Sequence, residues 1–535
     1  MDNETWARLR TLLGTPCLRY LLACEAQEQP DPDAPGDLTA GQLEALSMLD
    51  ALLPAEVAER VGIQREWLIE QQLTMSPDGQ EYPSTAIRRS AGGAVAGLTA
   101  DDPLTDLVLR LFDDAYPFLL IPREHAAFGA KLPSCFYKHP AEQRFAELIV
   151  EDPDLSRLFP EENAHTGKGG AYVGPGRGGS LQLWGFAAHL VVKAWEFAQL
   201  DVEVPTPHDV AAKIPGVVDS VRRAASGETV KVPARVGLAG ILLPDGCDAV
   251  EGKGFRIRRA DARDQRLIAG TTLEGQASGE GPDGEAVLLD YAGNLVLETT
   301  MTYRIKLGPL SPEMSWPANL TALRTEWETL IEDVRLAVAL TSAVGSPTII
   351  VVPSWTLTAD LLGQGPGLEW ANTRQDFRLE PRRLTQAEVV DWGEWLERVR
   401  TTKGRERLEV AIRRLLQARG SQRSIDDIFI DAVMVWENLF GGAGETTLRI
   451  TTSLAWLLAK DYESRKALAK ELKDIYTLRS RIVHGAKQTS PSDVPLANRA
   501  VQIAADALRV LYTQRPELMG EHDGTARSNR IMLGG

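Results

Sequence analysis

One short segment near the C-terminal end of the chain contains residues that could move protons and stabilise negative charge. Residues 464–485, SRKALAKELKDIYTLRSRIVHG, include Arg479 and, after four intervening residues, His484. A histidine can take up and return a proton, and an arginine guanidinium can stabilise the phosphorane-like state of a phosphoryl transfer. This pair, without a set of metal ligands beside it, favours metal-independent cleavage of RNA, although R-x-x-x-x-H also occurs by chance in many proteins.

The residues around Arg479 predict the face of the helix on which it lies. On a helix over 464–484, begun by Ser464 and ended by Gly485, Arg479 shares a stripe roughly 80° wide with four apolar residues. These four are Leu468, Leu472, Ile475 and Ile482. A guanidinium on an apolar stripe is costly without a partner, so either a core acid pairs with Arg479 or this face lines a groove that binds an anion. We expect a homodimer in which two such stripes meet about a two-fold axis and place both Arg/His pairs around one cleft.

The distribution of charge points to the same part of the chain. The 535 residues include 58 basic and 74 acidic side chains, a net charge of −16, which disfavours nucleic-acid binding over most of the surface. Two segments have the opposite sign: residues 465–487 carry seven bases and two acids, and residues 398–423 carry nine bases and two acids. RNA would bind at these segments, unless both are simply solvated helix faces.

Three other motifs are weaker. The glycine-rich segment 165–180 lacks the spacing of a phosphate-binding loop around Lys168, which predicts a mobile surface loop. Residues 54–72 imitate a helix-turn-helix, but the second helix, QREWLIEQQ, carries two acids and one base, so a DNA-binding regulator is the less favoured reading. The seven histidines form no helical pair at metal-ligand spacing, so we expect no metal site and no cofactor.

The composition is that of a globular protein, with 44% hydrophobic and 25% charged residues. The four cysteines form no C-x-x-C motif, the N-terminus MDNETWARLR has no signal-peptide pattern, and no apolar run is long enough to cross a membrane. These features predict a cytoplasmic protein with no membrane partner.

The periodicity predicts an α+β multidomain fold. Residues 1–228 read as mainly helical, and residues 229–380 as β-rich, because residues 295–307 alternate apolar and polar side chains at a strict spacing of two. Residues 381–515 read as an all-α bundle, and residues 516–535 as a flexible tail. The six helices expected in the bundle cover 384–400, 405–419, 425–440, 446–460, 464–484 and 494–515.

The bundle contains a run that resembles a known family. Residues 408–485, with the motifs IDAVMVWENLF, GETTLRI and IYTLRSRIVHG, resemble the Apea-like branch of the HEPN superfamily. The resemblance implies a helical bundle, often dimeric, that in many members cleaves RNA without a metal through an R-x(4–6)-H motif shared across a dimer cleft. By position, Arg479 and His484 match that motif, Ser480 matches its frequent polar residue, and Glu437 matches an acid on an earlier helix.

These observations lead to one leading hypothesis and two alternatives. The leading hypothesis is a metal-independent endoribonuclease effector of the bacterial defence or toxin type, with Arg479, His484 and Glu437 as catalytic residues. Neighbouring residues that would bind the RNA are Ser480, Lys473, Arg481 and Lys487. The N-terminal region would then sense a trigger or meet an antitoxin partner. The alternatives are a non-catalytic HEPN module that binds nucleotides or RNA or serves as a scaffold, and the DNA-binding regulator that uses 54–72.

Overall fold

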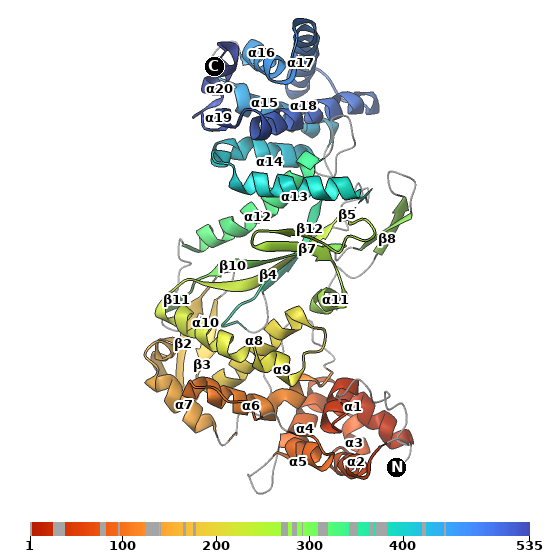
Figure 1. The fold of residues 1–535 in the computed structure, drawn as a ribbon, viewed down its shortest axis with the longest axis vertical. Coiled ribbons are helices and arrows are strands. Elements are labelled where there is room, and N and C mark those ends of the chain that lie inside the picture. Colours follow the sequence, from red (N-terminus) through yellow and green to blue (C-terminus); the bar gives the residue numbers. More distant parts are fainter. Residues whose placement is uncertain are drawn as a thin grey trace.

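The structure, a computed structural model, has an elongated mixed α+β fold (Figure 1). N-terminal helices form one end, strands occupy the middle, and C-terminal helices form the other end. The described residues are 3–24, 38–74, 82–94, 97–122, 139, 141–163, 167–174, 178–268, 276–280, 286–290, 293–308, 319–341, 351–363, 367–370, 382–419, 424–442 and 446–534.

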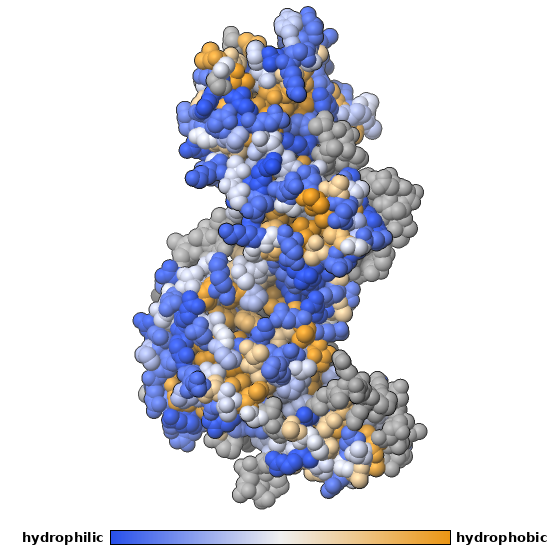
Figure 2. All heavy atoms as spheres, viewed as in Figure 1, coloured by the Kyte–Doolittle hydropathy of each residue, from blue (hydrophilic) through white to orange (hydrophobic). Residues whose placement is uncertain are grey.

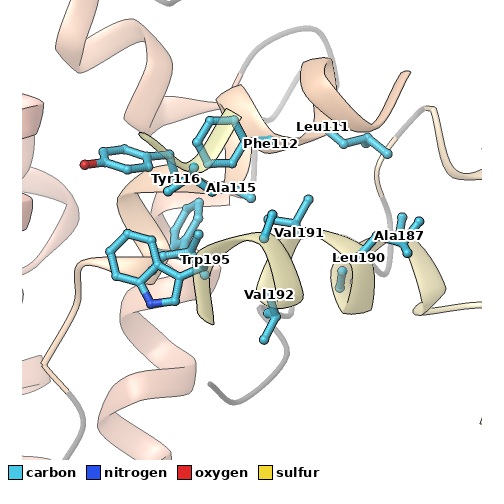
Figure 3. Packing of buried hydrophobic residues seen from close by; sticks show 14 of the residues in the cluster. Leu111, Phe112, Ala115, Tyr116, Ala187, Leu190, Val191, Val192 and Trp195 are labelled. Carbon is cyan, nitrogen blue, oxygen red and sulfur yellow. The ribbon is translucent and has the colours of Figure 1, made fainter. Parts of the chain in front are cut away.

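The N-terminal region is mainly helical, as expected. Its helices are α1 (Asn3–Leu21), α2 (Ala40–Leu52), α3 (Ala55–Ala58), α4 (Gly62–Thr74), α5 (Pro83–Ser90), α6 (Pro103–Leu119), α7 (Glu142–Glu151), α8 (Phe186–Asp201), α9 (Pro207–Ala211) and α10 (Ile214–Ser226), with a 3₁₀ turn at Leu155–Leu158. Apolar residues of α6 and α8 face each other in the core of this region, where Phe112, Tyr116 and Trp195 come together (Figure 3).

The glycine-rich segment forms a β-hairpin, so the prediction of a mobile loop was wrong for the described part of 165–180. Strands β2 (Gly167–Val173) and β3 (Gly178–Gln182) pair antiparallel. Glycine permits this packing, because a Cβ on Gly170 would lie 2.1 Å from the carbonyl oxygen of Leu158. Strands β1 (Glu161–Asn163) and β11 (Lys306–Gly308) complete this antiparallel sheet on β2.

The middle region contains a six-stranded antiparallel sheet. Its order is β13 (Gly367–Trp370), β12 (Val352–Thr358), β4 (Val230–Ala239), β10 (Leu295–Tyr303), β7 (Phe255–Arg259) and β6 (Ala249–Gly252). Also here are α11 (Ala262–Ile268), α12 (Asn319–Thr341), the hairpin β8 (Gln276–Glu280) with β9 (Ala286–Asp290), and the short parallel pair β5 (Ile241–Leu242) with β14 (Arg382–Arg383).

Two details of the predicted strands need correction. The alternation at 295–307 belongs to two strands, because β10 ends at Tyr303 and β11 joins the other sheet. The run TIIVV at 348–352 also predicts a strand, stopped by Pro353. Pro353 does not stop it: this residue lies inside β12 and is paired with Leu238, next to a register shift between Pro353 and Trp355. An irregularity of this kind lets a strand accommodate proline, which has no N–H to donate. Residues 348–350 of the expected strand lie outside the described residues.

The C-terminal helices follow the predicted bounds closely. They are α13 (Gln386–Thr401), α14 (Glu409–Ala418), α15 (Ile425–Phe440), α16 (Thr446–Leu458), α17 (Tyr462–Val483) and α18 (Val494–Thr513), with a 3₁₀ turn at Arg405–Leu408 and another at Pro491–Asp493. Asp461, rather than Ser464, is the N-cap of α17, and its carboxylate accepts a hydrogen bond from the Ser464 N–H at 2.9 Å.

The last twenty residues are not a flexible tail over their described part. They form α19 (Pro516–Met519) and α20 (Gly524–Met532), and Leu518 and Met519 are fully buried. Arg527, also buried, donates hydrogen bonds to the carbonyl oxygens of Leu439 and Asn438, both at 2.8 Å. This segment therefore caps the C-terminal end of α15, where helix carbonyls have no partners of their own.

The buried apolar residues form two clusters that do not follow the predicted domain limits. The first joins the N-terminal helices to Tyr303, Ile305 and residues 359–362. The second is continuous from the six-stranded sheet through α12 to the C-terminal helices. The expected boundary at 380–381 is thus not a break in the core, because α12 packs on α13, α14 and α18.

Candidate active site

Glu437 is held on α15 by the strong apolar face of that helix. The hydroxyl of Ser424 caps the start of α15 by accepting a hydrogen bond from the Asp427 N–H at 3.1 Å. Trp436 and Phe440 are fully buried, which turns the neighbouring Glu437 toward the edge of the bundle, where its side chain is 29% exposed. A partly exposed carboxylate in this position can hold a cation and still be reached by a substrate.

The Glu437 carboxylate contacts two side chains that lie one turn apart on α17. The Tyr476 hydroxyl donates a hydrogen bond to Glu437 Oε1 at 2.7 Å, and Arg479 Nη2 lies 3.5 Å from Glu437 Oε2. Burial, reinforced by the Glu437 charge, raises the pKa of Tyr476 to about 12. Tyr476 therefore stays protonated near neutral pH and acts as a hydrogen-bond donor rather than as a base.

Arg479 has N–H groups that its contact with Glu437 does not use. Its side chain is 20% exposed, and its buried Nε has no hydrogen-bond partner among the described residues. The guanidinium carries five N–H groups. It can therefore offer an anion further hydrogen bonds while Glu437 holds its orientation.

His484 lies at the C-terminal end of α17. Its N–H donates to the Ser480 carbonyl at 3.1 Å, and Gly485 follows with φ of +68°, the left-handed conformation that ends many helices. The His484 side chain is exposed and makes no hydrogen bond or ion pair with any described side chain. The structure thus brings Arg479 to Glu437 but does not bring His484 into contact with Arg479.

The apolar stripe around Arg479 faces the interior of the same chain. Leu472, Ile475 and Ile482 are buried, and Leu468 packs partly buried on the same cluster. Helix α17 packs on α15, α16 and α18 through this face. The stripe is therefore not free to form a symmetric interface, and the core acid that we considered as the alternative partner of Arg479 is Glu437.

The residues near Arg479 and His484 that we expect to bind RNA differ in their exposure and in whether an acid already pairs with them. Lys473 and Arg481 are exposed and have no ion-pair partner in the described parts of the chain, and Ser480 is half-buried. Lys487 is already engaged, because its Nζ lies 3.2 Å from Asp493 Oδ2.

The second basic segment, 398–423, uses three of its nine bases for ion pairs or buried contacts within the chain. Arg405 pairs with Glu332 and Asp333, Arg414 pairs with Asp431, and buried Arg419 donates to the Ala339 carbonyl. Five other bases of the segment are exposed and have no ion pair with a described residue: Arg398, Arg400, Lys403, Arg407 and Arg413. The expectation that RNA binds along this segment therefore stays a prediction.

The segment 54–72 does not have the proportions of a DNA-reading unit. Helix α3 has only four residues, and α4 carries Glu66 and Glu70.

No group of three or more histidine, cysteine, aspartate or glutamate side chains that could hold a metal ion occurs in the ranges that the structure describes. Within those ranges, no helix has the length and apolarity needed to cross a membrane.

Tyr476 is the site residue that our sequence reasoning missed. Its position three residues before Arg479 places the two side chains on neighbouring positions of one helix face. That spacing could have indicated a shared partner, but the identity of the partner depends on how α15 packs on α17.

Comparison of the chain with protein-family models, with curated proteins and with solved structures finds no match.

Proposed function

We propose that the C-terminal helices form a metal-independent endoribonuclease of the HEPN type. The observation that carries the proposal is the site at the end of α17: Arg479, oriented by Glu437 and 20% exposed, lies on the same helix end as the exposed His484. Both side chains that the chemistry needs are thus at the edge of the bundle, one oriented and one free to move. The rest of the chain would regulate access to this end, as expected of an effector with a sensing region.

The reaction is an internal displacement at phosphorus. The imidazole of His484 takes the proton of a ribose 2′-hydroxyl, the 2′ oxygen attacks the adjacent phosphorus, and the bond to the 5′ oxygen breaks. The leaving 5′ oxygen takes a proton from water, and protonated His484 returns its proton to the hydroxide that remains, which gives a 2′,3′-cyclic phosphate and a 5′-hydroxyl end. Arg479 stabilises the negative charge on the phosphoryl oxygens as the transition state forms. Glu437 and Tyr476 are positioning residues, because they act through the orientation of Arg479.

A second copy of the chain would complete the site. Because Arg479 and His484 do not touch within one chain, the cleft would take these residues from both members of a homodimer. Val483, directly before His484, is 49% exposed and offers apolar surface for such a contact. The dimer contact would therefore use the end of α17 rather than the buried stripe.

The test compares purified full-length variants on mixed single-stranded RNA. We expect cleavage that survives EDTA, leaves cyclic phosphate ends and is lost in His484→Ala, while the melting temperature stays unchanged because this side chain is exposed. The matched control is His522→Ala, which removes a histidine that is 78% exposed elsewhere on the bundle. Cleavage that needs added magnesium, or that persists in His484→Ala, would overturn the proposal.

The separation of Arg479 and His484 favours one second candidate. A HEPN module that binds RNA or nucleotides without cutting them would need the cationic surface and Arg479 but not His484. RNA binding by the wild-type chain, equal in His484→Ala and without any cleavage product, would establish this candidate instead.

A further inference from the structure

The outward face of α17 is a continuous row of exposed side chains. Seven residues recur at spacings of four or three, which places them on one side of a helix. We call this row the α17 ridge; its members are Tyr462, Lys466, Lys470, Lys473, Thr477, Arg481 and His484, all exposed. The helix has 22 residues and is therefore ~33 Å long. In Figure 2 the end of the molecule that α17 forms is largely hydrophilic.

The cations of the α17 ridge form no ion pairs with the residues that the structure describes. Lys470, Lys473 and Arg481 have no ion pair with any described residue, and Lys466 contacts only the ring of Tyr462, with its Nζ 5.9 Å from the ring centroid. Glu471 on the flank of the helix is already paired with Arg499 at 2.8 Å. Two exposed acids, Glu463 and Asp474, lie beside the ridge and have no ion pair with a described residue. An unpaired row of four cations is unusual in a chain with a net charge of −16, and it favours an extended polyanion as the ligand.

Aromatic side chains lie at the beginning of the ridge. Tyr462 is 71% exposed, and Trp456, at the end of α16, is 47% exposed. The guanidinium of Arg465 lies over the Trp456 ring, 3.8 Å from its centroid. Exposed aromatic rings together with cations form the surface on which the bases of single-stranded nucleic acids stack, whereas a duplex hides the faces of its bases.

We propose that the α17 ridge, with Trp456 and Arg465 at its beginning, is a track for single-stranded RNA. The lysines and Arg481 contact successive phosphates, bases stack on Tyr462 and Trp456, and the strand is led along the helix to His484. A stacked strand rises ~3.4 Å per nucleotide, so the ridge accommodates up to about ten nucleotides. The direction of the track toward His484 rests on the proposed function, but binding of the strand does not.

Fluorescence anisotropy with a labelled single-stranded 12-nucleotide oligouridine tests the proposal on the full-length chain. The charge variant is Lys466→Gln/Lys470→Gln/Lys473→Gln, and the stacking variant is Trp456→Ala/Tyr462→Ala. The matched control, Lys253→Gln/Arg304→Gln/Lys306→Gln, removes three exposed charges from the middle region.

We expect Kd to rise at least about tenfold in the charge variant and in the stacking variant, and less than about twofold in the control. The slope of log affinity against log salt concentration should become smaller by ~2 in the charge variant, because three phosphate contacts are lost. Equal weakening in the control, or a duplex bound as tightly as the single strand and unaffected by the stacking variant, would overturn the track.

The same variants separate this proposal from the proposed function. If the wild-type chain binds the oligonucleotide through the ridge but leaves it intact, the proposed nuclease activity is contradicted and the proposed RNA track is supported. If the wild-type chain cleaves RNA and the ridge variants bind and cut it normally, the proposed nuclease activity is supported and the proposed RNA track is contradicted.

Discussion

At position 170 the local packing leaves no room for a side chain, so only glycine fits without a change of the backbone. A Cβ at this position would lie 2.1 Å from the Leu158 carbonyl oxygen and 2.8 Å from the Pro160 ring, so Gly170→Ala requires the backbone to shift. We expect a loss of about 1–3 kcal/mol in the free energy of unfolding, measured by urea denaturation. The control is Gly216→Ala in α10, where a Cβ meets no atom and helix propensity predicts a gain of about 0.5–1 kcal/mol. Equal stability of the two variants would contradict this account.

His189 predicts a dependence of stability on pH. Burial on α8, with the Lys193 charge acting in the same direction, lowers the pKa of His189 to about 4, and the ring bonds the Leu361 carbonyl at 2.8 Å. An unfolded histidine has a pKa of about 6.5, so between these values the unfolded state binds more protons and stability falls as the pH falls. The loss from this group is at most about 3 kcal/mol.

The variant His189→Gln isolates this contribution, because it keeps a donor for the Leu361 carbonyl and does not titrate. Urea midpoints measured from pH 7.5 to 4.5 should fall less steeply in His189→Gln than in the wild type. His208→Gln, which changes an exposed histidine, should follow the wild-type curve. Parallel curves for all three proteins would show that His189 does not titrate as proposed.

At the scale of elements, α20 stabilises the bundle that carries Glu437. Arg527 is 1% exposed and donates to two carbonyls at the end of α15, so Arg527→Ala leaves these groups buried and unpaired. We expect a loss of about 2–4 kcal/mol, measured by denaturation. Arg530→Ala on the same helix breaks only a partly exposed ion pair with Glu521 and should cost less than about 1 kcal/mol. A chain truncated after residue 515 that keeps full stability would contradict the role of α20.

At the scale of the whole molecule, the two apolar clusters predict two unfolding transitions. Phe112 belongs to the first cluster and Leu508 to the second, and both are fully buried. Phe112→Ala and Leu508→Ala each create a cavity that costs about 2–5 kcal/mol. In calorimetry of the full chain, each substitution should lower the temperature of a different transition. A single transition that both substitutions lower equally would show that the clusters unfold together.

The local features of the C-terminal helices were predictable because they depend on neighbours in sequence. Periodic apolar residues and helix-ending residues such as Gly485 set the bounds of α13 to α18 to within a few residues. The position of His484 at the end of a helix follows from the same local signals.

What depended on distant residues was decided only by the tertiary structure. The stripe around Arg479 has the same pattern whether it faces a core or a second copy, and the packing of α15 on α17 selects the core and supplies Glu437. The polar sequence after residue 515 does not reveal that Arg527 meets the end of α15. The spacing of Arg479 and His484 identified both residues, but whether they meet depends on the direction of the chain after α17. The apolar pattern of the sequence predicts which residues are buried. Which residues they pack against depends on contacts between elements that are far apart in the sequence.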